Sequence, residues 1–181
     1  MIKEACVGNL REALRAQELG ADRIELCENL AEGGTTPSGG TIVTCMKMLR
    51  IPIVVMIRPR GGDFVYTAEE VECMLEDIQL CRKAGVFGIA TGVLTPDNHI
   101  DTALLAKLLA AAGPLQVTFH KAIDDCADPI EEIRKLRDSG VRRVLTSGGK
   151  PTASEGVANI NAMALAAPAL RSVAAGKVSR E

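Results

Sequence analysis

Short apolar, β-branched runs alternate with stretches of helical periodicity along most of the chain. Strands are predicted at six of these runs, at about 2–7, 22–27, 51–57, 86–91, 115–120 and 142–147. Helices are predicted between them, at 9–19, 40–49, 67–84, 101–112 and 128–139. Regular alternation of strand and helix is typical of a parallel sheet with right-handed crossovers. The pattern therefore predicts an α/β protein with about six βα units.

Two architectures satisfy this alternation, an open doubly wound sheet and a TIM-type (β/α)₈ barrel. A dinucleotide-binding doubly wound sheet normally has a G-x-G-x-x-G turn after its first strand, and the turn here reads Cys6-Val7-Gly8-Asn9. The strands also carry polar residues on one face only. Such strands suit a barrel, whose outer face meets helices and whose interior becomes polar towards one mouth. We therefore expect the barrel.

The first two strands show this parity most clearly. Glu4 and Cys6 share one face of the first strand, and Glu25 and Cys27 share one face of the second with Arg23. The later strands follow the same rule, with Arg58 after the third strand and Thr118 and His120 on one face of the fifth.

Length is the difficulty for this fold, because a complete barrel typically needs about 250 residues and the chain has 181. We expect residues 1–150 to form a partial barrel and 151–181 to form an Ala-rich helical tail, partly disordered. The tail shows no strand signal, and its one helix is predicted at about 153–166, before Pro168. A truncated or frame-shifted gene product is the expected explanation.

Composition and charge exclude several function classes. The net charge is −2 and aromatic residues make up 2% of the chain, which argues against nucleic-acid binding. No apolar run is long enough to span a membrane, and the first residues do not resemble a signal peptide. A cytoplasmic protein is therefore expected, with six reduced cysteines of which none forms a C-x-x-C pair.

Polar residues close most of the predicted strands, where barrel enzymes place their chemistry. They are Cys6, Cys27, Arg58, His120 and the pair Thr146-Ser147. Thiolates of Cys6 and Cys27, on neighbouring strands at similar height, suit a soft metal ion such as Cu(I) or Zn²⁺, although buried free thiols fit the same pattern. Glu4 and Glu25 need partners among Arg23, Arg58 and His120, in a network that is either structural or ligand-binding.

Three loops after strands contain residues suited to anions. Backbone amides of the Gly-rich segments 32–38 and 147–150 can cradle an anion, with Lys150 adding charge. Arg58 and Arg60, on a constrained loop, suit a carboxylate or phosphate. His120 suits proton transfer or metal binding, and Asp124 is expected to orient its second nitrogen if the loop turns back.

Five segments are specific enough to compare with a known family. They are Asp22-Arg23-Ile24-Glu25-Leu26-Cys27, Glu32-Gly33-Gly34-Thr35-Thr36-Pro37-Ser38, Met56-Ile57-Arg58-Pro59-Arg60-Gly61-Gly62-Asp63-Phe64, Thr118-Phe119-His120-Lys121-Ala122 and Val144-Leu145-Thr146-Ser147-Gly148-Gly149. These segments resemble the CutC family, the copper homeostasis proteins. The resemblance implies a cytoplasmic TIM barrel linked to copper, with Cu(I) held by Cys6 and Cys27 and Cys126 as a weaker candidate. The sequence departs from the family pattern at Lys121 and Ile123, and the family's last two βα units are absent from it.

Three hypotheses follow. The first is a CutC-like copper homeostasis protein that binds Cu(I) through Cys6 and Cys27. The second is a barrel enzyme with a small anionic substrate and with His120 or Glu25 as acid–base groups. Its predicted ligand-binding residues are Glu4, Arg23, Glu25, Arg58, Arg60, His120 and Ser147. The third is a non-functional fragment whose open strand edges favour self-association into a homo-oligomer.

Overall fold

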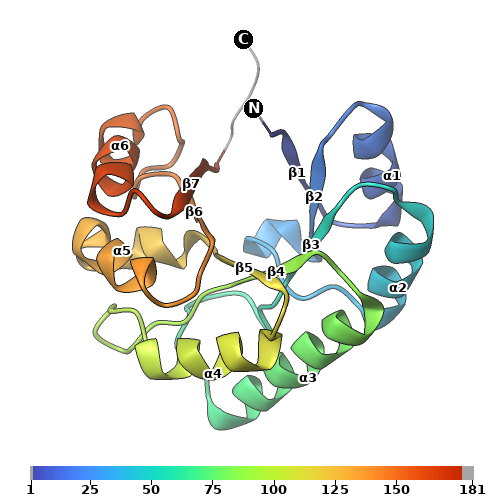
Figure 1. The fold of residues 1–181 in the computed structure, drawn as a ribbon, viewed down its shortest axis with the longest axis horizontal. Helices are drawn as coiled ribbons and strands as arrows, with labels where there is room; N and C mark the ends of the chain where they lie inside the picture. Colours follow the sequence, from blue (N-terminus) through green and yellow to red (C-terminus); the bar gives the residue numbers. More distant parts are fainter. Residues whose placement is uncertain (1, 177–181) are drawn as a thin grey trace. The chain divides into compact units, whose positions relative to one another are not determined.

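Strands and helices alternate through residues 2–176, the part of the chain that the computed structural model describes (Figure 1). The strands of this part are β1 (Glu4–Val7), β2 (Arg23–Leu26), β3 (Ile53–Met56), β4 (Gly88–Thr91), β5 (Gln116–Phe119), β6 (Arg143–Thr146) and β7 (Arg171–Ala174). Its α-helices are α1 (Leu10–Glu18), α2 (Gly39–Met48), α3 (Ala68–Ala84), α4 (Thr102–Ala112), α5 (Pro129–Arg137) and α6 (Val157–Ala166). Two 3₁₀ turns, η1 (Leu30–Glu32) and η2 (Lys121–Asp125), follow β2 and β5.

The chain divides into two compact units. Unit 1 runs to Thr91 and includes Ala111–Gln116, and unit 2 consists of Gly92–Ala110 and the chain from Val117. Unit 1 thus contains β1 to β4 with α1 to α3. Unit 2 contains most of α4 and β5, followed by the elements from η2 to β7.

In unit 1 the four strands are parallel and pair in sequence order. Cys6 lies opposite Glu25, and Glu25 lies opposite Val54, so these three residues share one face of the sheet. Ile24 and Leu26 occupy the other face and are fully buried. Strands that pair in sequence order lack the reversal of a doubly wound sheet, so the arrangement within this unit is that of a barrel.

Local sequence explains where the helices of unit 1 begin. Asn9 caps α1 by accepting a hydrogen bond from the Glu12 amide, and Ser38 does the same for α2 at Thr41. Thr67 and Glu70 form a reciprocal capping box at the start of α3. These caps end the loops that follow β1, β2 and β3, and so fix where the helices begin.

In unit 2, β7 is a strand that was not predicted from the sequence. It pairs in parallel with β6 at four positions, from Arg143 opposite Arg171 to Thr146 opposite Ala174. Its sequence, Arg-Ser-Val-Ala, contains one β-branched residue, so pairing with β6 outweighs weak strand propensity. The helix predicted at about 153–166 is present as α6, beginning at Val157. Residues 177–181, the end of the tail predicted to be partly disordered, lie outside the described residues.

None of the helices within residues 2–176 is long and apolar enough to cross a membrane.

Candidate metal centre

Two cysteines and one glutamate converge at the ends of β1 and β2, inside unit 1. Cys6 and Glu25 are direct partners in the parallel ladder, and Cys27 follows β2 on the same face as Glu25. The two sulfur atoms lie 3.8 Å apart. One ligand atom from each of the three residues lies within 4.8 Å of the others. The predicted Cys6–Cys27 pair is therefore brought together, and Glu25 joins it as a third donor that was not assigned to a metal from the sequence.

The three side chains differ in exposure. Cys6 is exposed, whereas Glu25 and Cys27 are 8% and 1% exposed. An ion would therefore enter from the Cys6 side and meet two buried donors. Two sulfur atoms and a carboxylate oxygen within reach of one point fit a soft or borderline metal ion, which this donor set would hold in place.

The Cys27 thiol is strongly biased towards its protonated form. Its hydrogen bond with Cys6, its burial and the negative charge of Glu25 all raise its pKa. Arg58 acts in the opposite direction but is outweighed. A metal ion must displace a proton to bind Cys27.

Arg58 fastens two loops beside this cluster. Its buried guanidinium donates through Nη1 to the carbonyl oxygens of Glu32 (2.7 Å) and Gly34 (3.0 Å). Through Nη2 it donates to the Gly62 carbonyl at 2.7 Å. It also lies over the Phe64 ring, 4.8 Å from its centroid. Arg58 thus ties the loop after β2 to the loop after β3.

Gly34 allows the loop after β2 to approach Cys27 closely. A Cβ at this position would lie 3.2 Å from Cys27 Sγ, and the residue has a φ of +92°. Glycine therefore meets two requirements here, the backbone conformation and the close approach to sulfur.

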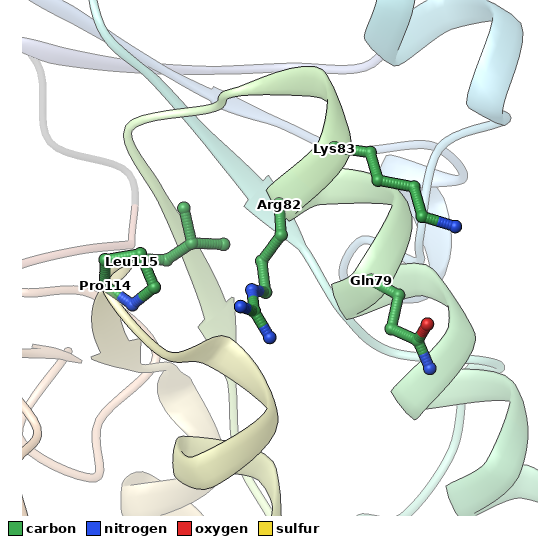
Figure 2. Close-up of a pocket in the computed structure, with 5 residues that line it drawn as sticks. All are labelled: Gln79, Arg82, Lys83, Pro114 and Leu115. Carbon is green, nitrogen blue, oxygen red and sulfur yellow. The ribbon is translucent and has the colours of Figure 1, made fainter.

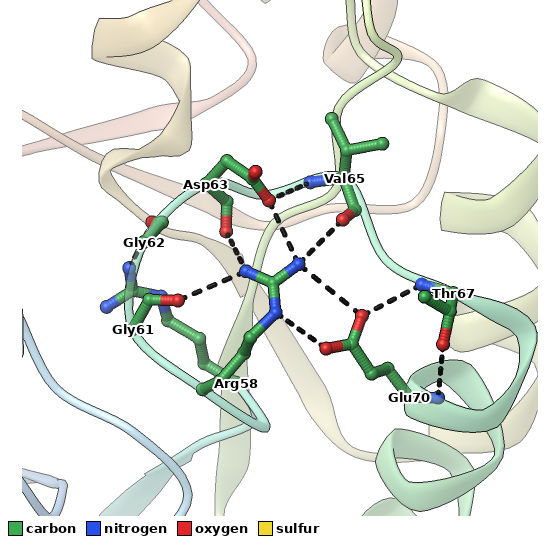
Figure 3. A network of polar contacts seen from close by, with 8 residues as sticks. Arg58, Gly61, Gly62, Asp63, Val65, Thr67 and Glu70 are labelled. Atoms are coloured by element: carbon green, nitrogen blue, oxygen red, sulfur yellow. Dashed lines mark hydrogen bonds and ion pairs between the residues drawn. The ribbon is translucent and has the colours of Figure 1, made fainter.

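Arg60 binds its own loop, and its partners Asp63, Val65 and Glu70 are labelled in Figure 3. Its Nε donates to Glu70 Oε1 at 2.6 Å, and its Nη2 donates to the Val65 carbonyl (2.9 Å) and to Asp63 Oδ1 (3.0 Å). Glu70 also accepts from the Thr67 amide, so Arg60 is joined to the cap of α3. The role of Arg60 towards an anionic ligand stays a prediction.

Glu4 and Arg23 pair in the ladder two positions before Cys6 and Glu25, and they form an ion pair between Glu4 Oε2 and Arg23 Nε. Their side chains are 9% and 11% exposed. This confirms that a carboxylate on this face is paired with Arg23. The arginine also lies 5.7 Å from the centroid of the Phe87 ring.

The remaining predicted residues, His120 and Ser147, belong to unit 2. His120 is buried, and its Nδ1 accepts a hydrogen bond from the Ala122 amide at 3.2 Å, which caps η2. In neutral imidazole the proton then resides on Nε2. Gly92 packs against the ring, since a Cβ there would lie 2.5 Å from it.

The side chain of Asp124, a residue of η2, reaches the Gly-rich loop after β6. Its carboxylate accepts from the amides of Ser147 (2.9 Å) and Gly149 (3.0 Å) and from the Ser147 hydroxyl (3.0 Å). Thr146 Oγ1 is a further donor. The predicted anion cradle thus holds a carboxylate of the chain itself. Asp124 directs both oxygens to this loop, whereas the sequence led us to expect that it orients His120.

A shallow cavity of about 390 Å³ lies beside the end of α3 in unit 1, separate in sequence from the cysteine cluster (Figure 2). It is lined by Gln79, Arg82, Lys83, Pro114 and Leu115. Arg82 donates to the Ala111 carbonyl at 3.1 Å, so its positive charge stabilises the C-terminal end of α4.

The fold and the cluster fit a family of barrel proteins, and comparison with known proteins names it. The chain matches the model of the CutC family over residues 1–179 and belongs to that family. A "family protein CutC" of Salmonella newport (strain SL254) is 52% identical over 157 residues, which cover 87% of this chain and 63% of the relative. The chain thus spans less than two thirds of the length of this curated relative.

Solved structures agree on the fold. The "Putative Copper Homeostasis Protein CutC" from Streptococcus agalactiae is 36% identical, with a TM-score of 0.90 over 95% of this chain and 86% of that one. "QR15, an Aldolase" has a TM-score of 0.69 at 11% identity, covering 98% of this chain and 80% of that one, and it shows the fold alone. The predicted TIM-type barrel, incomplete in this chain, is confirmed.

Proposed function

We propose that this chain is a copper homeostasis protein that binds Cu(I) through the thiolates of Cys6 and Cys27. The observation that carries the proposal is the 3.8 Å approach of the two sulfur atoms from neighbouring strands. Thiolate sulfur is the ligand that Cu(I) prefers. The name of the Streptococcus agalactiae relative, which refers to copper homeostasis, supports the same reading.

The two cysteines play different parts in this function. Cys6 is exposed and meets the incoming ion, while buried Cys27 binds it from the protein interior. Binding converts two thiols to thiolates and so releases protons, which makes the affinity rise with pH. The guanidinium of Arg58 offsets part of the negative charge that develops on Cys27.

A Cu(I) titration against a competing chromophoric chelator, under anaerobic reducing conditions, tests this function. Cys27→Ser should weaken Cu(I) binding by more than about 100-fold, because removing a ligand costs more than the roughly 10–100-fold loss seen when groups that merely orient ligands are removed. Cys73→Ser is the matched control, because Cys73 is an exposed thiol of α3 outside the cluster. Equal Cu(I) uptake by Cys27→Ser and the parent chain would disprove the proposal.

A further inference from the structure

The sulfur–sulfur distance carries information about the shape of the metal site. Two thiolates on opposite sides of one ion are separated by about twice the roughly 2.3 Å metal–sulfur bond, or about 4.6 Å, and by about 3.8 Å when the angle at the ion is near tetrahedral. The observed distance between Cys6 Sγ and Cys27 Sγ is 3.8 Å. The pair is therefore spaced for a bent arrangement, which leaves further coordination positions open.

Glu25 lies where it can supply one of those positions. It is paired with Cys6 across the ladder and is two residues before Cys27 on the same face of β2. Its carboxylate oxygen lies within 4.8 Å of both sulfur atoms. The residue is only 8% exposed, so the carboxylate lies at the cluster and largely away from solvent. The three donors come from two paired strands of a single unit.

The chemistry of this donor set differs from that of a thiolate pair. Carboxylate oxygen is a harder ligand than sulfur and suits divalent ions, and Zn²⁺ accepts sulfur and oxygen together in tetrahedral sites. Two thiolates and a carboxylate also carry three negative charges, which a divalent ion offsets better than Cu(I) does. Cys6 is exposed, so water can reach the ion as a fourth ligand.

We propose that Glu25 is the third ligand of this centre and that it allows the centre to hold a divalent ion of the zinc class. The inference rests on the thiolate pair of the proposed function and adds a second class of ion to it. Glu25 distinguishes the two ions, because Zn²⁺ uses the carboxylate and Cu(I) relies on the sulfur atoms.

The test measures Zn²⁺ and Cu(I) affinities of the same variants by competition with chelators. Glu25→Gln should weaken Zn²⁺ binding by at least about 10-fold, the lower end of the loss seen even when groups that only orient metal ligands are removed, and should leave Cu(I) affinity within about threefold. Glu28→Gln is the control, an exposed carboxylate three residues further along the chain. It should bind both ions as the parent chain does.

Co²⁺ gives a spectroscopic reading of the same site. The parent chain should show sulfur-to-cobalt charge-transfer bands together with intense visible bands of a tetrahedral ion. Glu25→Gln should retain the charge-transfer bands and shift the visible bands. X-ray absorption spectra at the zinc edge of the Zn²⁺-loaded, unaltered chain should show a coordination shell that mixes sulfur with lighter atoms. This measurement does not depend on the folding of any variant.

Three outcomes would overturn the inference. They are equal Zn²⁺ affinity and identical Co²⁺ spectra for Glu25→Gln and the parent, an equal loss of both ions in Glu25→Gln, and a Zn²⁺ shell made only of sulfur or free of it. Failure of the proposed function is distinguished from these outcomes, because the parent chain itself would then not bind Cu(I).

Discussion

The ends of β2 and β6 carry polar groups in the same structural position, yet the two sites differ in what they bind. After β6, backbone amides and hydroxyls surround the Asp124 carboxylate, so the chain supplies both the cradle and its anion. After β1 and β2, two sulfur atoms and a carboxylate converge, and all three are groups that could bind a cation. Hydrogen-bond donors that surround a carboxylate of the same chain stabilise the fold. Several possible ligands of a cation gathered at one place instead indicate a binding site for an ion from solution.

The same contrast separates the two arginines after β3. Both fasten loops, but Arg60 does so among the carboxylates of Asp63 and Glu70, while Arg58 donates to backbone carbonyls beside the cysteine cluster. Arg58 therefore brings a positive charge close to Cys27, where it opposes the effects that raise the pKa of that thiol.

The largest expected effect is on stability, at the internally satisfied site. Asp124→Ala should lower the free energy of unfolding by about 2–4 kcal/mol, because hydrogen bonds to a charged group contribute about 1.5–3 kcal/mol and the buried donors of Thr146 and Ser147 would lose their acceptor. Chemical denaturation measures the loss, and Cu(I) affinity should remain at the parent value. An unchanged stability would show that Asp124 is not what holds the loop after β6.

A smaller loss is expected at Gly34, where stability and metal binding should change together. Gly34→Ala imposes an unfavourable φ and places a methyl group 3.2 Å from Cys27 Sγ. We expect about 1–2 kcal/mol of destabilisation and weaker Cu(I) binding. Gly85→Ala is the control, because Gly85 also has a positive φ, +74°, and a Cβ added there would meet no atom within 4 Å. If both variants bind Cu(I) alike, the contact with sulfur has no role.

Thiol labelling sharpens the contrast among the cysteines. Cys6 and Cys73 are exposed and should react quickly with iodoacetamide, whereas burial raises the pKa values of Cys81 and Cys126 to about 12 and keeps them unreactive. Added Cu(I) should protect Cys6 and leave Cys73 reactive, as read by mass spectrometry of peptides. Equal protection of both thiols, or of neither, would argue against a specific centre at Cys6.

The smallest expected effect concerns Glu132, another internally satisfied carboxylate of unit 2. Burial would raise its pKa, but hydrogen bonds from Lys135, the Ile100 amide and His99 outweigh burial and lower it. A lowered pKa contributes stability above the unfolded pKa of about 4.3, and this contribution is lost as the pH falls through the folded value.

Glu132→Gln should therefore destabilise the protein by about 1 kcal/mol at pH 7, and the stability difference between the variant and the parent should become smaller below about pH 4. Melting temperatures of both proteins across this pH range measure the difference. A stability difference that increased on acidification would contradict the assigned direction of the Glu132 pKa shift.

Much of the fold and of the site follows from the sequence because side-chain parity is a local property. Alternation along β1 and β2 placed Cys6 and Glu25 on one face, and the ladder register confirms it. β7 was not predictable in this way, because a strand with a single β-branched residue depends on its partner β6. The bonds of Asp124 were equally hidden, since they join residues 22 to 25 positions apart through a loop.

The most direct test of the thiolate centre is X-ray absorption spectroscopy at the copper edge of the Cu(I)-loaded chain and of its Cys27→Ser and Cys73→Ser variants. We predict one copper per chain with sulfur neighbours, fewer of them in Cys27→Ser and an unchanged shell in Cys73→Ser. Copper bound through nitrogen and oxygen alone, or an identical shell in all three proteins, would contradict this centre.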